Sequence, residues 1–102
     1  TDMSYLFDNL RNFNADISGW NTSRVTDMHG MFHRAWAFNQ SLSWDTSSVT
    51  DMGWMFKSAH TFNQPLTWDT SRVTNIAYTF MNAWAFNQPL RWDTSRVTDM
   101  IW

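Results

Sequence analysis

The sequence contains no cysteine and no glutamate, and it has only three glycines and two prolines in 102 residues. Without cysteine, a disulfide framework and a thiolate metal site are excluded. Without glutamate, every acidic side chain is an aspartate. No apolar run approaches the roughly 18 residues that a membrane helix needs, so direct insertion of this segment into a membrane is not expected. The net charge of −2, without a polybasic stretch, argues against nucleic acid as a partner.

The residues that are abundant are aromatic, with eight tryptophans and eight phenylalanines. Trp20, Trp44, Trp68 and Trp92 recur at an interval of 24 residues. Such an interval is typical of arrays in which each unit stacks on its neighbour. We therefore expect a single unit over residues 1–102, with repeats at approximately 1–25, 26–49, 50–73 and 74–97 and a partial repeat at 98–102. Both ends stop at the same phase of the repeat without a polar cap, which predicts a segment of a longer array.

Within each repeat, one stretch has helical spacing. Val25, Met28, Met31, Phe32 and Ala35 fall on one side of a helix, and the next repeat has the same spacing. A short helix ending near Ala35 is therefore predicted.

A second stretch has strand spacing, because Pro65 and Pro89 favour extended geometry and Leu66 and Trp68 are two residues apart. Asp-Thr-Ser then predicts a turn. The extra residue of the first repeat falls at Ser18-Gly19, where a bulge or loosened turn is expected.

The recurring positions predict a core and a ladder of hydrogen bonds. The expected core consists of the aromatic residues Trp20, Trp44, Trp68, Trp92, Phe13, Phe38, Phe62, Phe86, Phe7, Phe32, Phe56 and Phe80. The tryptophans should form one interior column. The expected ladder, in which side chains bond backbone groups of the neighbouring repeat, consists of Asn14, Asn39, Asn63 and Asn87.

The candidate binding residues are aromatic or imidazole side chains at positions where the repeat does not dictate the residue. They are Tyr5, Trp54, Tyr78, Trp36, His60 and Trp84. The first three lie opposite the apolar stripe of the expected helix, and the others lie on its flank. Such rings suit protein or sugar binding, but they could equally cover one another on the outer face.

Three other patterns have simpler readings. The aspartates Asp45, Asp69, Asp93, Asp27, Asp51 and Asp99 could suggest calcium, but turn and cap chemistry accounts for them. His29 and His33 have metal-ligand spacing on a helix, but no third ligand is evident. Two columns of threonines could bind ice by ordering water, but turn and cap chemistry accounts for them too: Thr22, Thr46, Thr70, Thr94 and Thr26, Thr50, Thr74, Thr98. We expect no enzyme, no catalytic residue, no cofactor and no metal.

The phrase Phe-Asn-Gln-Pro-Leu-x-Trp-Asp-Thr-Ser-x-Val-Thr-Asp-Met-x-x-Met-Phe, most complete over residues 62–80, resembles the repeat of the BspA-like surface proteins. This leucine-rich-repeat-like family was first grouped from mycoplasma lipoproteins. The resemblance covers essentially the whole chain. It implies a secreted or surface-exposed protein, often lipid-anchored, with a role in adhesion or protein recognition and without catalytic residues.

The sequence therefore predicts an α/β fold, a right-handed leucine-rich-repeat-like solenoid of about four 24–25-residue repeats with one short parallel strand and one short helix each. Its expected function is a non-catalytic protein-interaction or adhesion module of a bacterial-type surface or secreted protein. A carbohydrate-binding surface, a structural spacer and an ice-binding threonine array remain as alternatives. The expected partner is a protein or glycan on the outer helix face, and exposed Ile101 and Trp102 leave end-to-end self-association open.

Overall fold

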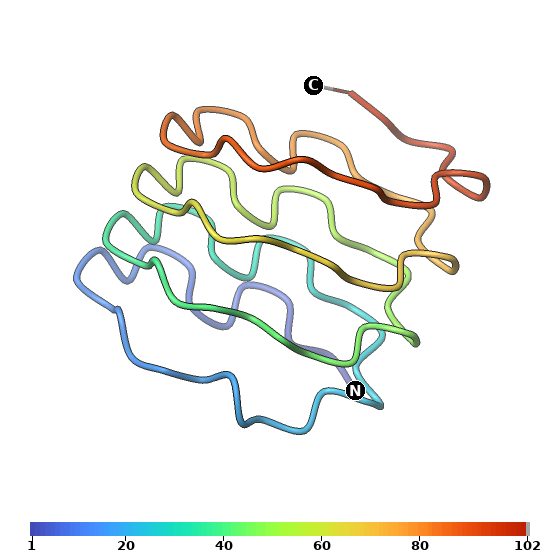
Figure 1. The fold of residues 1–102 in the computed structure, drawn as a ribbon, viewed down its shortest axis with the longest axis horizontal. Helices are drawn as coiled ribbons and strands as arrows, with labels where there is room; N and C mark the ends of the chain where they lie inside the picture. Colours follow the sequence, from blue (N-terminus) through green and yellow to red (C-terminus); the bar gives the residue numbers. More distant parts are fainter. Residues whose placement is uncertain (102) are drawn as a thin grey trace.

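The computed structural model describes residues 1–101, so Trp102, named above for self-association, lies outside the described residues. The chain winds in coils that lie one above the other, from the blue N-terminal coil to the red C-terminal one (Figure 1). Parallel bridges of one residue each join successive coils. They pair Asp2 with Asp27, Asp27 with Asp51, Asp51 with Asn75, and Asn75 with Asp99. Over residues 1–101 these bridges are the only strand pairing and no helix forms, so no helix there could cross a bilayer.

The expected leucine-rich-repeat-like α/β solenoid, with a strand and a helix in each repeat, is therefore wrong. The stretch with helical spacing forms a run of tight turns. In the second coil, the N–H groups of Met31, His33 and Ala35 each donate to the carbonyl three residues earlier. The N–H groups between them bond the next coil, since Phe32 donates to the Met55 carbonyl at 2.8 Å and Arg34 donates to the Lys57 carbonyl at 2.9 Å. Alternate N–H groups, which would bond within a helix, thus donate to carbonyls of the next coil instead.

We call this run of turns, at residues 4–9, 29–34, 53–58 and 77–82, the turn ribbon. In each coil it contains two residues, four positions apart, in the left-handed region. These residues have φ between 56° and 61°: Tyr5, Asn9, Gly30, Arg34, Trp54, Ser58, Tyr78 and Asn82. A non-glycine residue in this region costs of order 1 kcal/mol, and it persists only where the surroundings enforce it. Here the hydrogen bonds between coils enforce it. A four-residue repeat also brings Met28 and Phe32, and likewise Met31 and Ala35, into the core at intervals of four residues, which explains why the spacing resembled that of a helix.

The expected strand, around Leu66 and Trp68, is extended but does not pair as a strand. Its prolines have no N–H to donate, and side chains supply the links between coils instead. The N–H of Asn63 donates to the Asn39 side-chain oxygen at 2.9 Å, and that of Asn87 donates to Asn63 in the same way. The N–H of Asn39 bonds Asn14 at 2.8 Å, so the asparagines lie in a continuous chain of hydrogen bonds. One side of each coil is therefore joined by backbone bonds and the other by side chains.

The core between these two sides consists of stacked rings. One phenylalanine column contains Phe7, Phe32, Phe56 and Phe80, and a second contains Phe13, Phe38, Phe62 and Phe86. Within a coil the two columns also meet, since the rings of Phe56 and Phe62 lie 4.2 Å apart and nearly parallel. Apolar side chains such as Met52 and Val49 fill the remaining space and are fully buried. In the second and third coils, each phenylalanine ring of the columns thus contacts rings in its own coil and in the coils on either side.

The tryptophan column is shorter than the sequence suggests. Trp44, Trp68 and Trp92 stack at 6.4 and 6.2 Å, and Trp44 and Trp68 are buried. Each of their indole N–H groups donates to a carbonyl of the preceding coil, at 2.8 Å for Trp68 and Leu42. Trp20 instead packs at an angle against Phe7 and is 41% exposed. The extra residue makes a turn at Ser18 and Gly19, which displaces Trp20 from the column.

Candidate functional site

Two rows of aromatic and charged side chains, one from the turn ribbon and one from the short turn that follows it, together include every candidate binding residue from the sequence. The first, the tyrosine row, contains Tyr5, His29, Trp54, Lys57 and Tyr78. Tyr5 packs edge-on against His29, and Trp54 packs edge-on against Tyr78. The Lys57 ammonium lies 3.7 Å from the centre of the Trp54 ring. The side chains of this row therefore largely satisfy one another.

Gly30 explains why this row lacks a fourth aromatic residue. It occupies the same position in the second coil as Tyr5, Trp54 and Tyr78 do in theirs, with a φ of 61°. A Cβ at this position would lie 2.4 Å from the Tyr5 ring. The Tyr5 ring thus covers the Gly30 backbone, and the tyrosine row is a packed layer along this part of its length.

The second row, the indole row, contains Arg11, Trp36, His60 and Trp84. The Arg11 guanidinium lies 4.1 Å from the centre of the Trp36 ring, and Trp36 stacks on His60 at 5.4 Å. His60 stacks on Trp84 at 4.2 Å with a 5° angle between the planes. Trp36 is 37% exposed and Trp84 is 74% exposed. These groups are held in a fixed order while both indoles remain partly exposed.

The pair formed by His33 and Asp8 was not identified from the sequence as a functional pair. His33 Nδ1 and Asp8 Oδ1 lie 2.9 Å apart, without the alignment of a hydrogen bond. Burial lowers the pKa of His33, against the opposing effect of the Asp8 charge, while the positive charges of Arg34 and Lys57 lower it further. His29 and His33, whose spacing on a helix would suit a metal, each face a different aspartate: Asp51 for His29 and Asp8 for His33.

We expect acidification to destabilise the fold through His33. A folded-state pKa below the unfolded value of about 6.5 favours the neutral ring, so the contribution of His33 is complete above that pH and falls as the pH drops through the folded-state pKa. His33→Met, which copies Met81 of the last coil, should show a smaller loss of stability between pH 7.5 and 5.5. Urea unfolding of both proteins at the two pH values measures this. An equal loss in both proteins would show that His33 is not the origin of the pH dependence.

The aspartates that could suggest calcium hold the backbone turns. Asp45 Oδ1 accepts hydrogen bonds from the Ser47 hydroxyl at 2.6 Å and from the Ser47 N–H at 3.0 Å. These bonds lower the pKa of the Asp45 carboxyl, and Asp69 has the same arrangement with Ser71. No group of three or more acidic or histidine side chains with metal-site geometry occurs within residues 1–101. The role of these aspartates in this structure is therefore to accept hydrogen bonds within backbone turns.

The threonine columns are also part of the framework. The hydroxyls of Thr22, Thr46 and Thr70 are buried and donate to carbonyls of the following coil at 2.9 to 3.1 Å. The hydroxyls of the exposed column donate to carbonyls of the preceding coil, as that of Thr50 does to the Thr26 carbonyl at 3.2 Å. Both columns therefore use their hydroxyl hydrogens to link coils.

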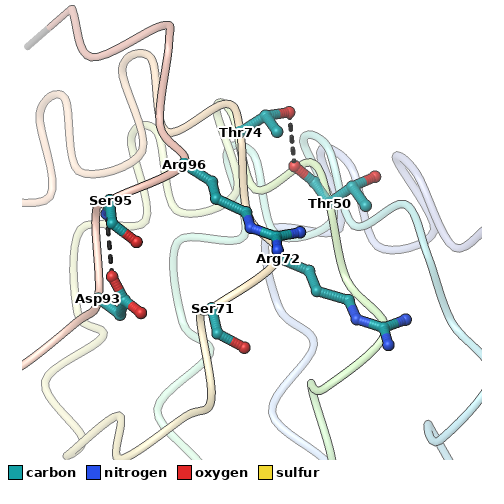
Figure 2. A pocket seen from close by; sticks show the side chains of 7 residues that line it. All are labelled: Thr50, Ser71, Arg72, Thr74, Asp93, Ser95 and Arg96. Carbon is teal, nitrogen blue, oxygen red and sulfur yellow. Dashed lines mark hydrogen bonds between the residues drawn. The ribbon is translucent and has the colours of Figure 1, made fainter.

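A polar hollow of about 640 Å³ opens beside the exposed threonine column. Figure 2 shows the residues that line it: Thr50, Ser71, Arg72, Thr74, Asp93, Ser95 and Arg96. The Arg72 and Arg96 side chains come from successive coils and extend in the same direction across it (Figure 2). We call it the arginine hollow. The only sign of this hollow in the sequence is arginine at one position of three repeats, namely Arg24, Arg72 and Arg96.

Comparison with known proteins identifies the family. The sequence profile of a family described as "Mycoplasma protein of unknown function, DUF285" matches residues 1–101. Neither the curated proteins nor the solved structures compared with this chain gave a match. The profile spans the coils, the two aromatic rows and the arginine hollow. The chain therefore belongs to the DUF285 family of Mycoplasma proteins.

Proposed function

We propose that this chain is a non-catalytic protein-recognition module that acts in adhesion at a cell surface or outside the cell, with the indole row as its contact surface. The extracellular setting rests on the resemblance of its repeat to that of the BspA-like surface proteins. The observation that carries the contact surface is the continuous stack from Arg11 to Trp84, in which both indoles are exposed.

The composition and rigidity of the indole row support this role. Tryptophan and arginine dominate the binding energy of protein interfaces, where they act as large, pre-ordered anchors. Stacking holds Trp36 between Arg11 and His60, so little side-chain freedom remains to be lost on binding. Trp36, His60 and Trp84 also come from three successive coils, which makes the row a surface longer than one repeat.

The use of the titratable groups supports a non-catalytic role. Asp45 and Asp69 accept hydrogen bonds within their own turns, and Asp27 accepts the N–H of His29 at 2.8 Å. These carboxylates have structural partners that a general acid or base would have to give up. The rings of Trp36 and Trp84, by comparison, have exposed surface that is available for binding.

The test is the adhesion of beads coated with the chain to cultured epithelial cells. The double variant Trp36→Ala/Trp84→Ala should reduce the number of bound beads at least tenfold, because two anchors of roughly 2 kcal/mol each are removed. The matched control is Trp20→Ala, which removes an indole of similar exposure, 41% against 37% for Trp36, outside the row. This control should bind as the unchanged chain does. Equal binding by the double variant and the unchanged chain would refute the assignment.

The same assay separates a protein partner from a glycan, the second candidate, which is favoured by the flat and exposed ring of Trp84. Cells treated with protease should lose binding, whereas cells whose surface sugars have been oxidised with periodate should keep it. The opposite pattern would support carbohydrate stacking on the indole row.

A further inference from the structure

The arginine hollow is lined only by charged and hydroxyl side chains, unlike the indole row, with which it shares no residue. Neither Arg72 nor Arg96 forms an ion pair with a carboxylate of residues 1–101. An arginine presents a planar fork of N–H donors that fits a carboxylate in a two-bonded geometry. Two such forks on neighbouring coils provide donors for an anionic group.

The rest of the lining disfavours a ligand that carries more than one negative charge. The Ser95 hydroxyl, the N–H of Ser95, which donates to Asp93 Oδ1 at 2.9 Å, and the charge of Arg96 all lower the pKa of the Asp93 carboxyl. Asp93 is therefore ionised at neutral pH and repels a second negative charge. It would instead accept a hydrogen bond from a ligand hydroxyl.

The hydroxyl groups of the lining complete this chemistry. The Ser71 hydroxyl donates to Asp69 at 2.7 Å and the Thr74 hydroxyl donates to the Thr50 carbonyl at 3.3 Å. Because their hydrogens are committed, their oxygens face a ligand as acceptors. The hollow thus offers donors for one carboxylate and acceptors for several hydroxyls.

We propose that the arginine hollow binds a sugar acid of the uronic type, with its carboxylate on the forks of Arg72 and Arg96 and its hydroxyls toward Asp93 and the serine and threonine oxygens. A hollow of about 640 Å³ is within the size range of small-molecule sites. Because it is open, a single sugar unit should bind weakly, with a Kd on the order of 1 mM.

The chain contains its own comparison for this site. The position of Arg72 and Arg96 in their coils is occupied by Ser48 in the coil before them. The Ser48 hydroxyl donates to the Ser23 carbonyl at 2.8 Å, so the fold accommodates serine here. The variant Arg72→Ser therefore removes one fork while it installs a residue that this position already tolerates.

The experiment is a titration followed by NMR of the arginine Nε–H signals, with sodium glucuronate as the probe. Glucuronate should shift the signals of Arg72 and Arg96, and glucose at the same concentration should not. Arg72→Ser should weaken glucuronate binding about tenfold, because one charge-assisted pair is lost. The control Arg91→Ala removes an exposed arginine that does not line the hollow and should leave the affinity unchanged.

Three results would overturn the proposal. The first is equal glucuronate affinity in Arg72→Ser and the unchanged chain. The second is an equal response of both arginines to inorganic phosphate, which would make the hollow a general anion site. The third is tighter binding of a glutamate-rich peptide than of glucuronate, which would assign the hollow to an acidic protein segment.

Discussion

Replacing Phe56 with alanine should lower the free energy of unfolding by about 4 kcal/mol. Phe56 is fully buried, and its ring stacks on Phe32 at 5.5 Å, on Phe80 at 5.7 Å and on Phe62 at 4.2 Å. Removal of the ring leaves a cavity at the crossing of the two phenylalanine columns, and the neighbouring rings are themselves held by bonds between coils. Urea unfolding followed by circular dichroism measures the loss.

Two variants test the cause of this loss. Phe56→Leu keeps much of the volume and should cost about 1.5 kcal/mol. Phe86→Ala removes a ring that is only partly buried, so it should cost about half as much as Phe56→Ala. If the two alanine variants lost the same stability, burial within the ring stack would not be the origin of the effect.

Replacing Trp68 with alanine should cost a similar amount, about 4 kcal/mol. Its ring lies between those of Trp44 and Trp92, and its indole N–H donates to the Leu42 carbonyl at 2.8 Å. Trp68→Phe retains a ring but leaves the Leu42 carbonyl without this donor, at a cost of about 2 kcal/mol. The difference between the two variants separates the packing of the ring from the hydrogen bond.

The control is Trp20→Phe, because Trp20 lies outside the column and should lose less than about 1 kcal/mol. The indole N–H of Trp68 should also exchange slowly with solvent in NMR, since Trp68 is buried and donates a short hydrogen bond. Fast exchange, or an unchanged stability of Trp68→Phe, would contradict the assigned role of this bond.

The interval between Trp44 and Trp68 was sufficient to predict that equivalent side chains lie above one another in successive coils. It was not sufficient to predict the backbone between them. The pairs Met28/Phe32 and Met31/Ala35 are each four residues apart, an interval that an α-helix and a run of four-residue turns share, so burial periodicity cannot separate the two. The deciding feature is which carbonyl each N–H bonds, and this depends on a neighbouring coil about 24 residues away in the chain. Gly30 was the available clue, since a glycine opposite the apolar stripe suits a positive φ.

The candidate site was predictable only in part for the same reason. Trp36, His60 and Trp84 share a phase of the repeat, and this phase is visible in the sequence. That Tyr5 covers Gly30, whereas Trp84 stays open, depends on side-chain directions that a helical wheel misplaces. The arginine hollow depends on the turns between Asp69 and Thr74 and between Asp93 and Thr98, whose shapes the spacing does not specify.

The turn at Ser18 and Gly19 has a consequence for how this chain can vary in length. The backbone-bonded side of each coil admits no added residue, because one extra amino acid would move every later donor away from its acceptor. The other side has already absorbed such an addition, and a Cβ at Gly19 would meet no atom within 4 Å. Insertions, whether they arise in evolution or by engineering of a loop, should therefore be tolerated only on the side of the coils that holds Ser18 and Gly19.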